Sequence, residues 1–387
     1  MEEDCMNEIQ ANRKENFITR DHTYVYLGGS LLSLLGLSLW HSAASPYSFI
    51  GDGSILGMVL ATVCWLFLVV SLLALLVKWT HWNTYNDTIM KQPCIVKASR
   101  YLSYLAAAAC LLLVADRVVL KLAYFIWFYM HAESNPASFF GSMMYMSYKG
   151  RSMLATGIWN TIRIALLGTA IAFFLSILLV FLRIQEPDKR DNDFVKFLKI
   201  VANKFASAYV FIIRGTPMMV QALIFYYAGF ALFKKTGLTV TEITQIWSFF
   251  ISGLITVSLN STAYLAEVLR GGIMAIDPGQ MEAARSLGMT HWQAMMKVVF
   301  PQAVKNSIPA IGNEFIINIK DSSVLSVIGC SDLMFMTKSV AGIYYRALEI
   351  YVVAAILYLV LTYLSSLLLK YLSKKLDTPA QGIPSSN

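Results

Sequence analysis

The sequence is poor in charge, with only 14% of its 387 residues being Asp, Glu, Lys or Arg, whereas 57% are hydrophobic. A soluble domain carries about 25% charged residues, so this composition excludes an ordinary soluble globular protein. Segments 55–77 and 351–369 have no charged residue at all. Each is long enough to cross about 30 Å of hydrocarbon as a helix. The chain is therefore predicted to be an all-α, polytopic helical membrane protein.

Several chemical signatures are also missing. The five cysteines are scattered and form no CxxC pair, so we expect neither a disulfide nor a metal site. No G-x-x-x-x-G-K-[ST] loop is present, so no nucleotide is expected to bind this chain and no cofactor is assigned to it. Without an HExxH or GxSxG signature, the chain is not expected to be an enzyme.

The formal net charge of +8 does not indicate nucleic acid binding in so hydrophobic a chain. Lys and Arg collect in the cytoplasmic loops of membrane proteins and fix their topology. Eight spans are predicted, near residues 24–41, 55–77, 101–130, 154–182, 206–233, 246–273, 308–330 and 350–369. All basic loops then share one face of the bilayer, so both termini are predicted to be cytoplasmic in a multi-pass cell-membrane protein. The first twenty residues are polar and mixed in charge, so we expect no cleavable signal peptide.

One further helix is expected between the fourth and fifth spans. Its apolar residues, Phe194, Phe197, Leu198 and Val201, recur at spacings of three and four. This is the pattern of an amphipathic helix lying in the membrane interface before the fifth span begins.

A polar, helix-patterned segment follows the sixth predicted span. Asp277 with Gln280 is typical of a capping box that starts a helix, and Thr290 with Gln293 repeats it. Gly288 between them is suited to end the first helix.

The second of these short helices is predicted to close at Pro301. Two capped helices, too short to span, predict a docking surface on the cytoplasmic side. The alternative is an ordinary interfacial re-entry.

The residues of this segment carry a resemblance to a known family. Glu282-Ala283-Ala284, Gly288, Val298 and Phe300-Pro301 resemble the EAA loop of ABC importer permeases. Three other segments, in the same order as in the polar amino acid permeases of that group, are similar as well: Arg214-Gly215-Thr216-Pro217 with Gln221; Thr262-Ala263-Tyr264-Leu265-Ala266-Glu267 with Arg270-Gly271-Gly272; and Pro301-Gln302-Ala303, Pro309, Asn313 and Lys320-Asp321-Ser322-Ser323.

The resemblance implies a domain organisation. Residues 151–376 would form a five-span type I ABC importer permease core, and residues 377–387 a cytoplasmic tail. Residues 1–150 would be an N-terminal extension with about three transmembrane helices.

The resemblance also implies partners. The EAA loop would dock on a separate ABC ATPase subunit, which binds the ATP, while a substrate-binding protein delivers a polar amino acid. A second permease copy or a sister permease would complete the path. The residues expected to couple to the ATPase are Gly279, Gln280, Glu282, Ala283, Ala284, Gly288 and Pro301.

Polar residues at membrane depth are costly and usually face a partner or a water-filled path. A zwitterionic substrate needs a donor for its carboxylate and an acceptor for its ammonium group. The candidates for the substrate path are Asn260, Ser261, Thr262, Glu267, Asn313, Lys320, Ser322 and Ser323. The alternative is that such residues only form hydrogen bonds between helices.

The other charged residues near the predicted spans are expected to form ion pairs or to reach the membrane interface. Glu267 and Arg270 lie three apart and can pair with each other. Arg214 is expected to extend to the interface without a substrate role. The cluster of Asp116, Arg117 and Lys121 is expected to pair internally, although it is also the coupling site that an ion-gradient-driven secondary amino acid transporter, the alternative function, would need.

Overall fold

The computed structural model describes residues 23–81, 89, 92–185, 187 and 191–375, and they are helical with short connections. The predicted tail 377–387 and the polar N-terminal segment lie outside the described residues. The chain divides into two compact units, Met1–Glu133 and Ser134–Asn387. The sequence predicts this division at residue 150, whereas the short helix α6 (Phe139–Lys149) packs against α7 (Arg151–Arg183) and α16 (Ala347–Lys375) of the second unit.

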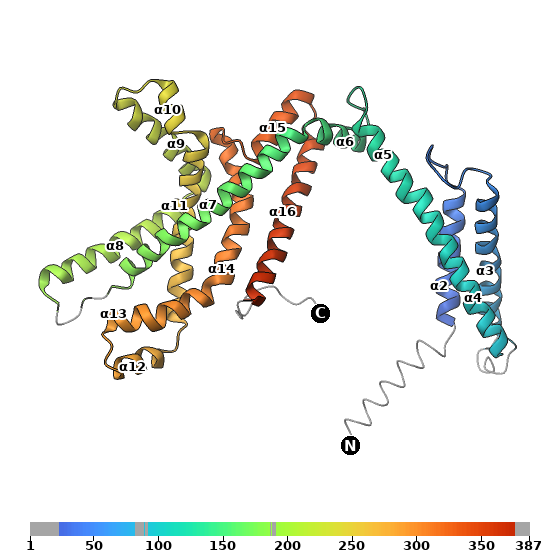
Figure 1. Ribbon diagram of the computed structural model, residues 1–387, viewed down its shortest axis with the longest axis horizontal. Coiled ribbons are helices and arrows are strands. Elements are labelled where there is room, and N and C mark those ends of the chain that lie inside the picture. The colour runs from blue at the N-terminus through green and yellow to red at the C-terminus, as the bar shows by residue number, and fades with distance from the viewer. Residues whose placement is uncertain (1–22, 82–88, 90–91, 186, 188–190, 376–387) are drawn as a thin grey trace, which may run out of the picture. The chain divides into compact units, whose positions relative to one another are not determined.

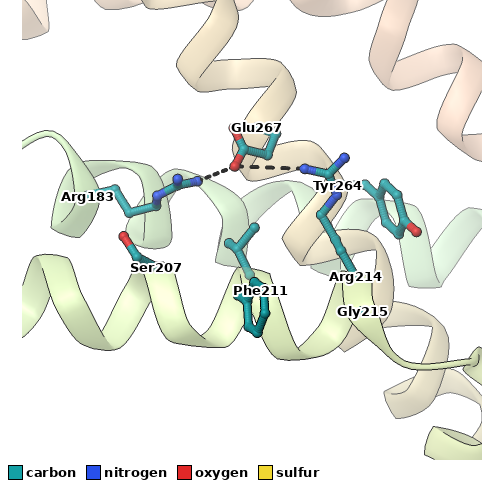
Figure 2. A pocket seen from close by; sticks show the side chains of 8 residues that line it. Arg183, Ser207, Phe211, Arg214, Gly215, Tyr264 and Glu267 are labelled. Atoms are coloured by element: carbon teal, nitrogen blue, oxygen red, sulfur yellow. Dashed lines mark hydrogen bonds and ion pairs between the residues drawn. The ribbon is translucent and has the colours of Figure 1, made fainter.

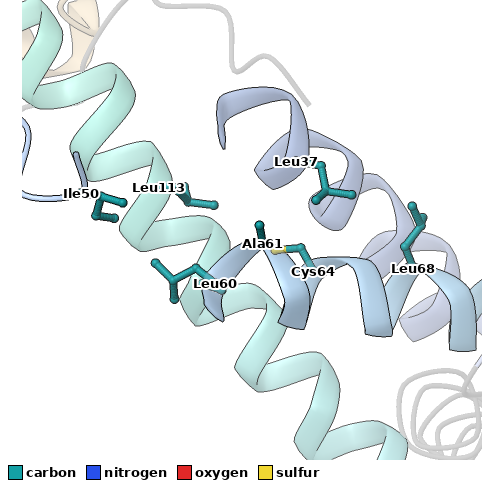
Figure 3. Close-up of a cluster of buried hydrophobic side chains, with 8 residues drawn as sticks. Leu37, Ile50, Leu60, Ala61, Cys64, Leu68 and Leu113 are labelled. Carbon is teal, nitrogen blue, oxygen red and sulfur yellow. The ribbon is translucent and has the colours of Figure 1, made fainter. Parts of the chain in front are cut away.

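The first unit is a small helical hairpin with a third helix packed against both of its arms (Figure 1). Its elements are α2 (Thr23–Trp40), α3 (Ile55–Thr80), α4 (Pro93–Val114), the π-helical segment η4 (Ala115–Leu120) and α5 (Lys121–Met130). The Ser54 hydroxyl caps α3 by accepting from Gly57 N. Leu37, Cys64 and Leu113, one from each helix, meet in its buried core (Figure 3).

The charges of the third predicted span make their contacts inside this unit. Asp116 and Arg117 are buried and pair at 3.3 Å, which confirms the expected internal pairing for these two residues, whereas Lys121 donates to the carbonyl of Ala43 at 3.2 Å. Asp116 also accepts the backbone N–H of Phe49 at 2.9 Å, and Arg117 donates to the carbonyl of Ile50 at 2.8 Å. The helix is not broken here, because α4, η4 and α5 run on continuously through a π-helical turn. These two charges therefore fasten the connection between α2 and α3.

The second unit is built around two long helices, α7 (Arg151–Arg183) and α11 (Phe249–Met274), which pack along each other. Its other elements are α8 (Asp193–Gly215), α9 (Met218–Lys235), α10 (Val240–Ile246), α12 (Pro278–Ser286), α13 (His291–Ala294), η5 (Met295–Val299), α14 (Phe300–Asp321), η6 (Ser322–Ile328), α15 (Leu333–Tyr344) and α16 (Ala347–Lys375). Small residues permit the close packing of these helices: at Gly272, an added Cβ would come 3.0 Å from the carbonyl oxygen of Ala303 on α14.

Among the described residues, four helices are long and apolar enough to span a membrane: α3, α7, α11 and α16. The number becomes six when α8 with α9, and 291–328 with α15, are each counted as one bent span. The second unit then has the five spans expected of a type I permease core. In the first unit only α3 meets this measure, since α2 is shorter and the α4–α5 helix does not meet it.

The structure corrects the predicted fifth span. The amphipathic helix is not separate from it, because α8 continues without interruption from Asp193 to Gly215. The chain then turns by 112° at Thr216 and Pro217 before α9 begins. Pro217 lacks an N–H and disfavours a helical conformation in the residue before it, and Thr216 is extended, so the α-helix ends at this point.

Candidate functional site

The polar segment forms two helices joined by a tight turn, as predicted. In the second unit, α12 and α13 lie at the opposite end from α10 and α15 (Figure 1). At the end of α12, Gly288 adopts a left-handed conformation with φ of 85°. Gly288 N donates to the carbonyl of Arg285, and Met289 N to that of Ala284. These two bonds form a Schellman motif, which satisfies the last carbonyls of the helix.

The predicted caps of this segment are half confirmed. Thr290 and Gln293 form the expected capping box. Asp277 caps α12, but its side chain accepts from Gly279 N, and Gln280 does not complete a box. Instead, the side-chain oxygen of Gln280 accepts a hydrogen bond from Gln302 at 3.4 Å.

The role predicted for Pro301 as the end of the second helix is wrong. From His291 the chain stays helical through η5 and α14 as far as Asp321. The π-helical segment η5 ends at Val299, and α14 begins at the next residue. Pro301 therefore lies in the first turn of α14, where a missing N–H costs little. The second short helix is thus the beginning of the predicted seventh span, which starts before residue 308.

The surface of α12 is mostly open. Glu282, Ala283 and Leu287 are exposed, and Leu287 is 83% exposed. Ala284 is the buried residue of the helix and packs it against the unit. The capped helix and its exposed C-terminal Leu287 thus leave this face open at the surface of the unit.

A second site lies where α7, α8 and α11 approach one another. Figure 2 shows Glu267 of α11 between Arg183 of α7 and Arg214 of α8, and Arg270 of α11 also pairs with it. Arg183 Nη1 lies 2.6 Å from Glu267 Oε1, and Arg270 Nε lies 2.9 Å from Oε2. Arg214 Nη1 is farther away, at 3.8 Å from Oε1. The expected pairing of Glu267 with Arg270 is confirmed, and it is one part of a larger cluster.

This cluster borders an open pocket of about 620 Å³. The pocket is lined by Arg183, Ser207, Val210, Phe211, Arg214, Gly215, Tyr264 and Glu267. The guanidinium of Arg214 lies over the Tyr264 ring, 5.2 Å from its centroid. A cation held over a ring in this way keeps a defined position. The pocket is thus lined by guanidinium donors from α7 and α8 and by a carboxylate from α11.

The comparisons with known proteins agree with this architecture. Residues 195–378 match the family of binding-protein-dependent transport system inner membrane components. The glutamine transport system permease GlnP of Escherichia coli K12 is 33% identical over 176 residues, which is 46% of this chain and 76% of that protein. The arginine transport system permease ArtQ of Bacillus subtilis strain 168 is 34% identical over 222 residues, covering 57% of this chain and 91% of that protein. The chain belongs to this permease family.

A solved structure extends the likeness to the fold. The crystal structure of an amino acid ABC transporter with histidines is similar with a TM-score of 0.50 and 34% identity. The match covers 62% of this permease and 99% of that chain. The permease is accordingly a multi-pass membrane subunit of an ATP-binding cassette importer, rather than a secondary transporter.

Sequence reasoning missed two members of the Glu267 cluster. Arg183 was assigned no role, and its partner lies 84 positions away in the chain. Arg214 was expected only to extend to the interface, yet it ends α8 and contacts Tyr264 and Glu267. The chain reversal between α7 and α8 brings both arginines to α11, and no local spacing in the sequence reports this.

The RGTP segment of the permease has a clear structural role at the α8–α9 bend. Gln221 is buried and donates to the carbonyls of Ile213 and Thr216, at 2.8 and 3.0 Å. Its own side-chain oxygen accepts from Asn260 of α11 at 2.9 Å. Gln221 therefore holds both sides of the bend and ties them to α11.

The other predicted substrate-path residues are not gathered in the pocket. Ser261 donates to Asn318, which in turn donates to Thr169, so this chain of bonds joins α11, α14 and α7. Thr262 is buried and donates to the carbonyl of Ser258 in its own helix, Ser322 is buried and donates to that of Ile319 at the end of α14, and Ser323 is half-buried. Asn313 and Lys320 are exposed on α14.

Proposed function

We propose that the permease moves a polar amino acid, and that the pocket beside Glu267 lies on the path of that substrate. The observation that carries this is the convergence of three arginines and one carboxylate at an open pocket. A zwitterion needs exactly opposed partners of this kind, namely donors for its carboxylate and an acceptor for its ammonium group. The relatives named for glutamine and arginine support amino acids as the substrate class.

We propose further that α12 docks on a separate ATPase subunit, which binds the ATP, and that a substrate-binding protein supplies the amino acid. The exposed residues Glu282 and Leu287 support the docking, since they stand on a short helix fixed by a Schellman turn. The lysines in the last turn of α16 lie at this same end of the unit, which favours a cytoplasmic position for both (Figure 1). A second permease copy or a sister permease completes the complex.

The test uses the tagged full-length chain isolated from its own cells with whatever ATPase remains bound. The complex is reconstituted in liposomes. Uptake of a mixture of labelled amino acids is then measured with and without ATP enclosed in the lumen. ATP-dependent uptake that Glu282→Ala and Leu287→Ala reduce at least tenfold is the expected result. Uptake that is unchanged without ATP, or a preparation that retains no ATPase, would contradict the proposal.

A further inference from the structure

The first unit contains a pocket of its own, about 280 Å³ in volume, where the α2–α3 connection meets α5. This volume is close to the lower limit of small-ligand pockets, which is about 300 Å³. The family model matches residues 195–378, which all lie in the second unit, so the family assigns no role to this pocket. One wall is residues 44–46 of the connection, and the other is formed on α5 by Lys121, Tyr124, Phe125, Phe128 and Tyr129.

Ser45, on the first wall, has a buried hydroxyl that lacks a partner. The residue is 7% exposed, and its Oγ atom makes no hydrogen bond to a described residue. Buried hydroxyl groups are nearly always paired, because an unpaired one loses its bonds to water without replacing them. Since Ser45 lines the pocket, a bound molecule that presents an oxygen acceptor would supply the missing bond.

Lys121, on the opposite wall, carries an uncompensated positive charge. Its Nζ atom donates to the carbonyl of Ala43 at 3.2 Å, and it forms no ion pair with a described residue. The carboxylates of Asp52 and Asp116 are both paired with Arg117 instead. An ammonium group has three donors, so Lys121 retains donors for an anion in the pocket.

The surroundings of the pocket are those of a membrane interface. Tyr and Trp collect at the level of the lipid headgroups. Here the ring of Tyr47 lies 5.4 Å from that of Tyr124 and 6.5 Å from that of Trp127, measured between centroids. The membrane-spanning helix α3 begins at Ile55, directly after the connection that forms the first wall.

The helix beside the pocket also has an apolar surface without a protein partner. None of the residues of α5 is buried against the described part of the chain. Its exposed side chains include Leu122, Trp127 and Phe128, which are 56%, 53% and 49% exposed. An anion-binding pocket that opens beside such a surface suits a molecule with a charged head and apolar chains.

We propose that this pocket binds the phosphate group of an anionic phospholipid. The phosphate oxygens accept hydrogen bonds from Lys121 and Ser45, and the acyl chains lie along the exposed apolar side chains of α5. Inorganic phosphate has the same acceptors but no apolar part to contact the four aromatic rings of the pocket. A zwitterionic lipid would bring its own cationic group near Lys121, so an anionic headgroup is preferred. The site is independent of the amino acid that the permease moves.

The experiment counts bound molecules by native mass spectrometry of the purified full-length chain in detergent micelles. Dioleoylphosphatidylglycerol, dioleoylphosphatidylcholine and sodium phosphate are titrated separately. We expect one phosphatidylglycerol to be retained at a concentration about fivefold lower than phosphatidylcholine, which is the attraction of one lysine for an anionic lipid. Sodium phosphate at the same concentration should neither bind nor displace the lipid.

Variants assign the binding to the two walls. Lys121→Gln should remove the preference for phosphatidylglycerol, whereas Lys121→Arg should keep it, because the positive charge remains. Ser45→Ala should weaken the binding of both lipids about threefold, because each presents a phosphate. Lys97→Gln is the matched control, since Lys97 is exposed near the opposite end of the continuous α4–α5 helix and should leave the preference unchanged.

Each contrary result removes a specific part of the proposal. Equal retention of the two lipids, or an equal loss of preference in Lys97→Gln and Lys121→Gln, would overturn the anionic headgroup. Displacement of phosphatidylglycerol by an equal concentration of sodium phosphate would overturn the lipid and leave a site for free phosphate. Thermal unfolding shows which variants keep the fold. If Lys121→Gln does not fold, unchanged lipid binding by Ser45→Ala would overturn the assignment of the pocket.

Discussion

Arg183, the last residue of α7, and Glu267 of α11 are joined by an ion pair of 2.6 Å. Their side chains are 16% and 23% exposed, so water screens the pair only in part. The same carboxylate also holds Arg270 and lies near Arg214. One acidic residue thus holds three arginines from three helices together, so replacing Glu267 tests the whole cluster.

Glu267→Gln should destabilise the protein, because the neutral amide leaves three arginines that repel one another. The pair is partly exposed, so we expect a loss of about 1–3 kcal/mol in the free energy of unfolding. Denaturant unfolding in detergent micelles, followed by tryptophan fluorescence, measures it. Glu133→Gln, at an exposed acid outside this cluster, is the control and should change stability by less than about 0.5 kcal/mol. An equal effect of both substitutions would show that Glu267 has no such role.

The fold could be predicted further than the site. Long apolar segments predicted α3, α7, α11 and α16 within about six residues at each end, because span length and hydropathy are local properties. The bend after Gly215 and the continuity through Pro301 were not predicted. Both depend on how a proline is accommodated by its neighbours, in one case by a turn and in the other by a π-helical segment.

The candidate site was only partly predictable for a related reason. Residues close in sequence, such as Glu267 with Arg270 or Thr290 with Gln293, were correctly paired from helical spacing. Arg183 could not be paired in this way, since its position depends on the crossing of α7 and α11. Long-range contacts of this kind depend on how the helices pack against one another, which cannot be read from a single sequence.

Gln221→Leu should destabilise the α8–α9 bend. The buried amide makes three bonds to residues before the bend, and Asn260 would lose its acceptor as well. Because buried carbonyls and the Asn260 amide would be left without hydrogen-bond partners, we expect the free energy of unfolding to fall by about 2–3 kcal/mol. Gln302→Leu is a suitable comparison, because Gln302 is exposed and should cost less than about 0.5 kcal/mol. If Gln221→Leu is as harmless as Gln302→Leu in denaturant unfolding, the amide does not hold the bend.

Acid should loosen the connection between α2 and α3. The hydrogen bond from Arg117 holds the pKa of Asp52 below its ordinary value. A folded-state pKa below the unfolded value means that this contact stabilises the loop above about pH 4 and that the contribution is lost as the pH falls further. The protection of the backbone amides of residues 42–54 against hydrogen exchange, relative to the intrinsic rate at each pH, should therefore fall below about pH 4. In Asp52→Asn this loss of protection should be smaller, and an unchanged acid response in that variant would exclude Asp52 as its source.

The sharpest test of the docking surface compares two glycines that share the same left-handed backbone conformation. Gly288, after α12, has φ of 85°, and Gly237, before α10, has φ of 84°. An added Cβ meets no atom within 4 Å at either position, so replacement by alanine introduces backbone strain and no clash. Each Gly→Ala substitution should cost about 1–2 kcal/mol of stability, because an L-residue disfavours the left-handed conformation. Only Gly288→Ala distorts the turn that fixes α12, so it alone should reduce ATP-driven uptake and ATPase retention in the reconstituted complex. Equal uptake by the two alanine variants at equal stability would mean that the geometry of this turn does not transmit the ATPase motion.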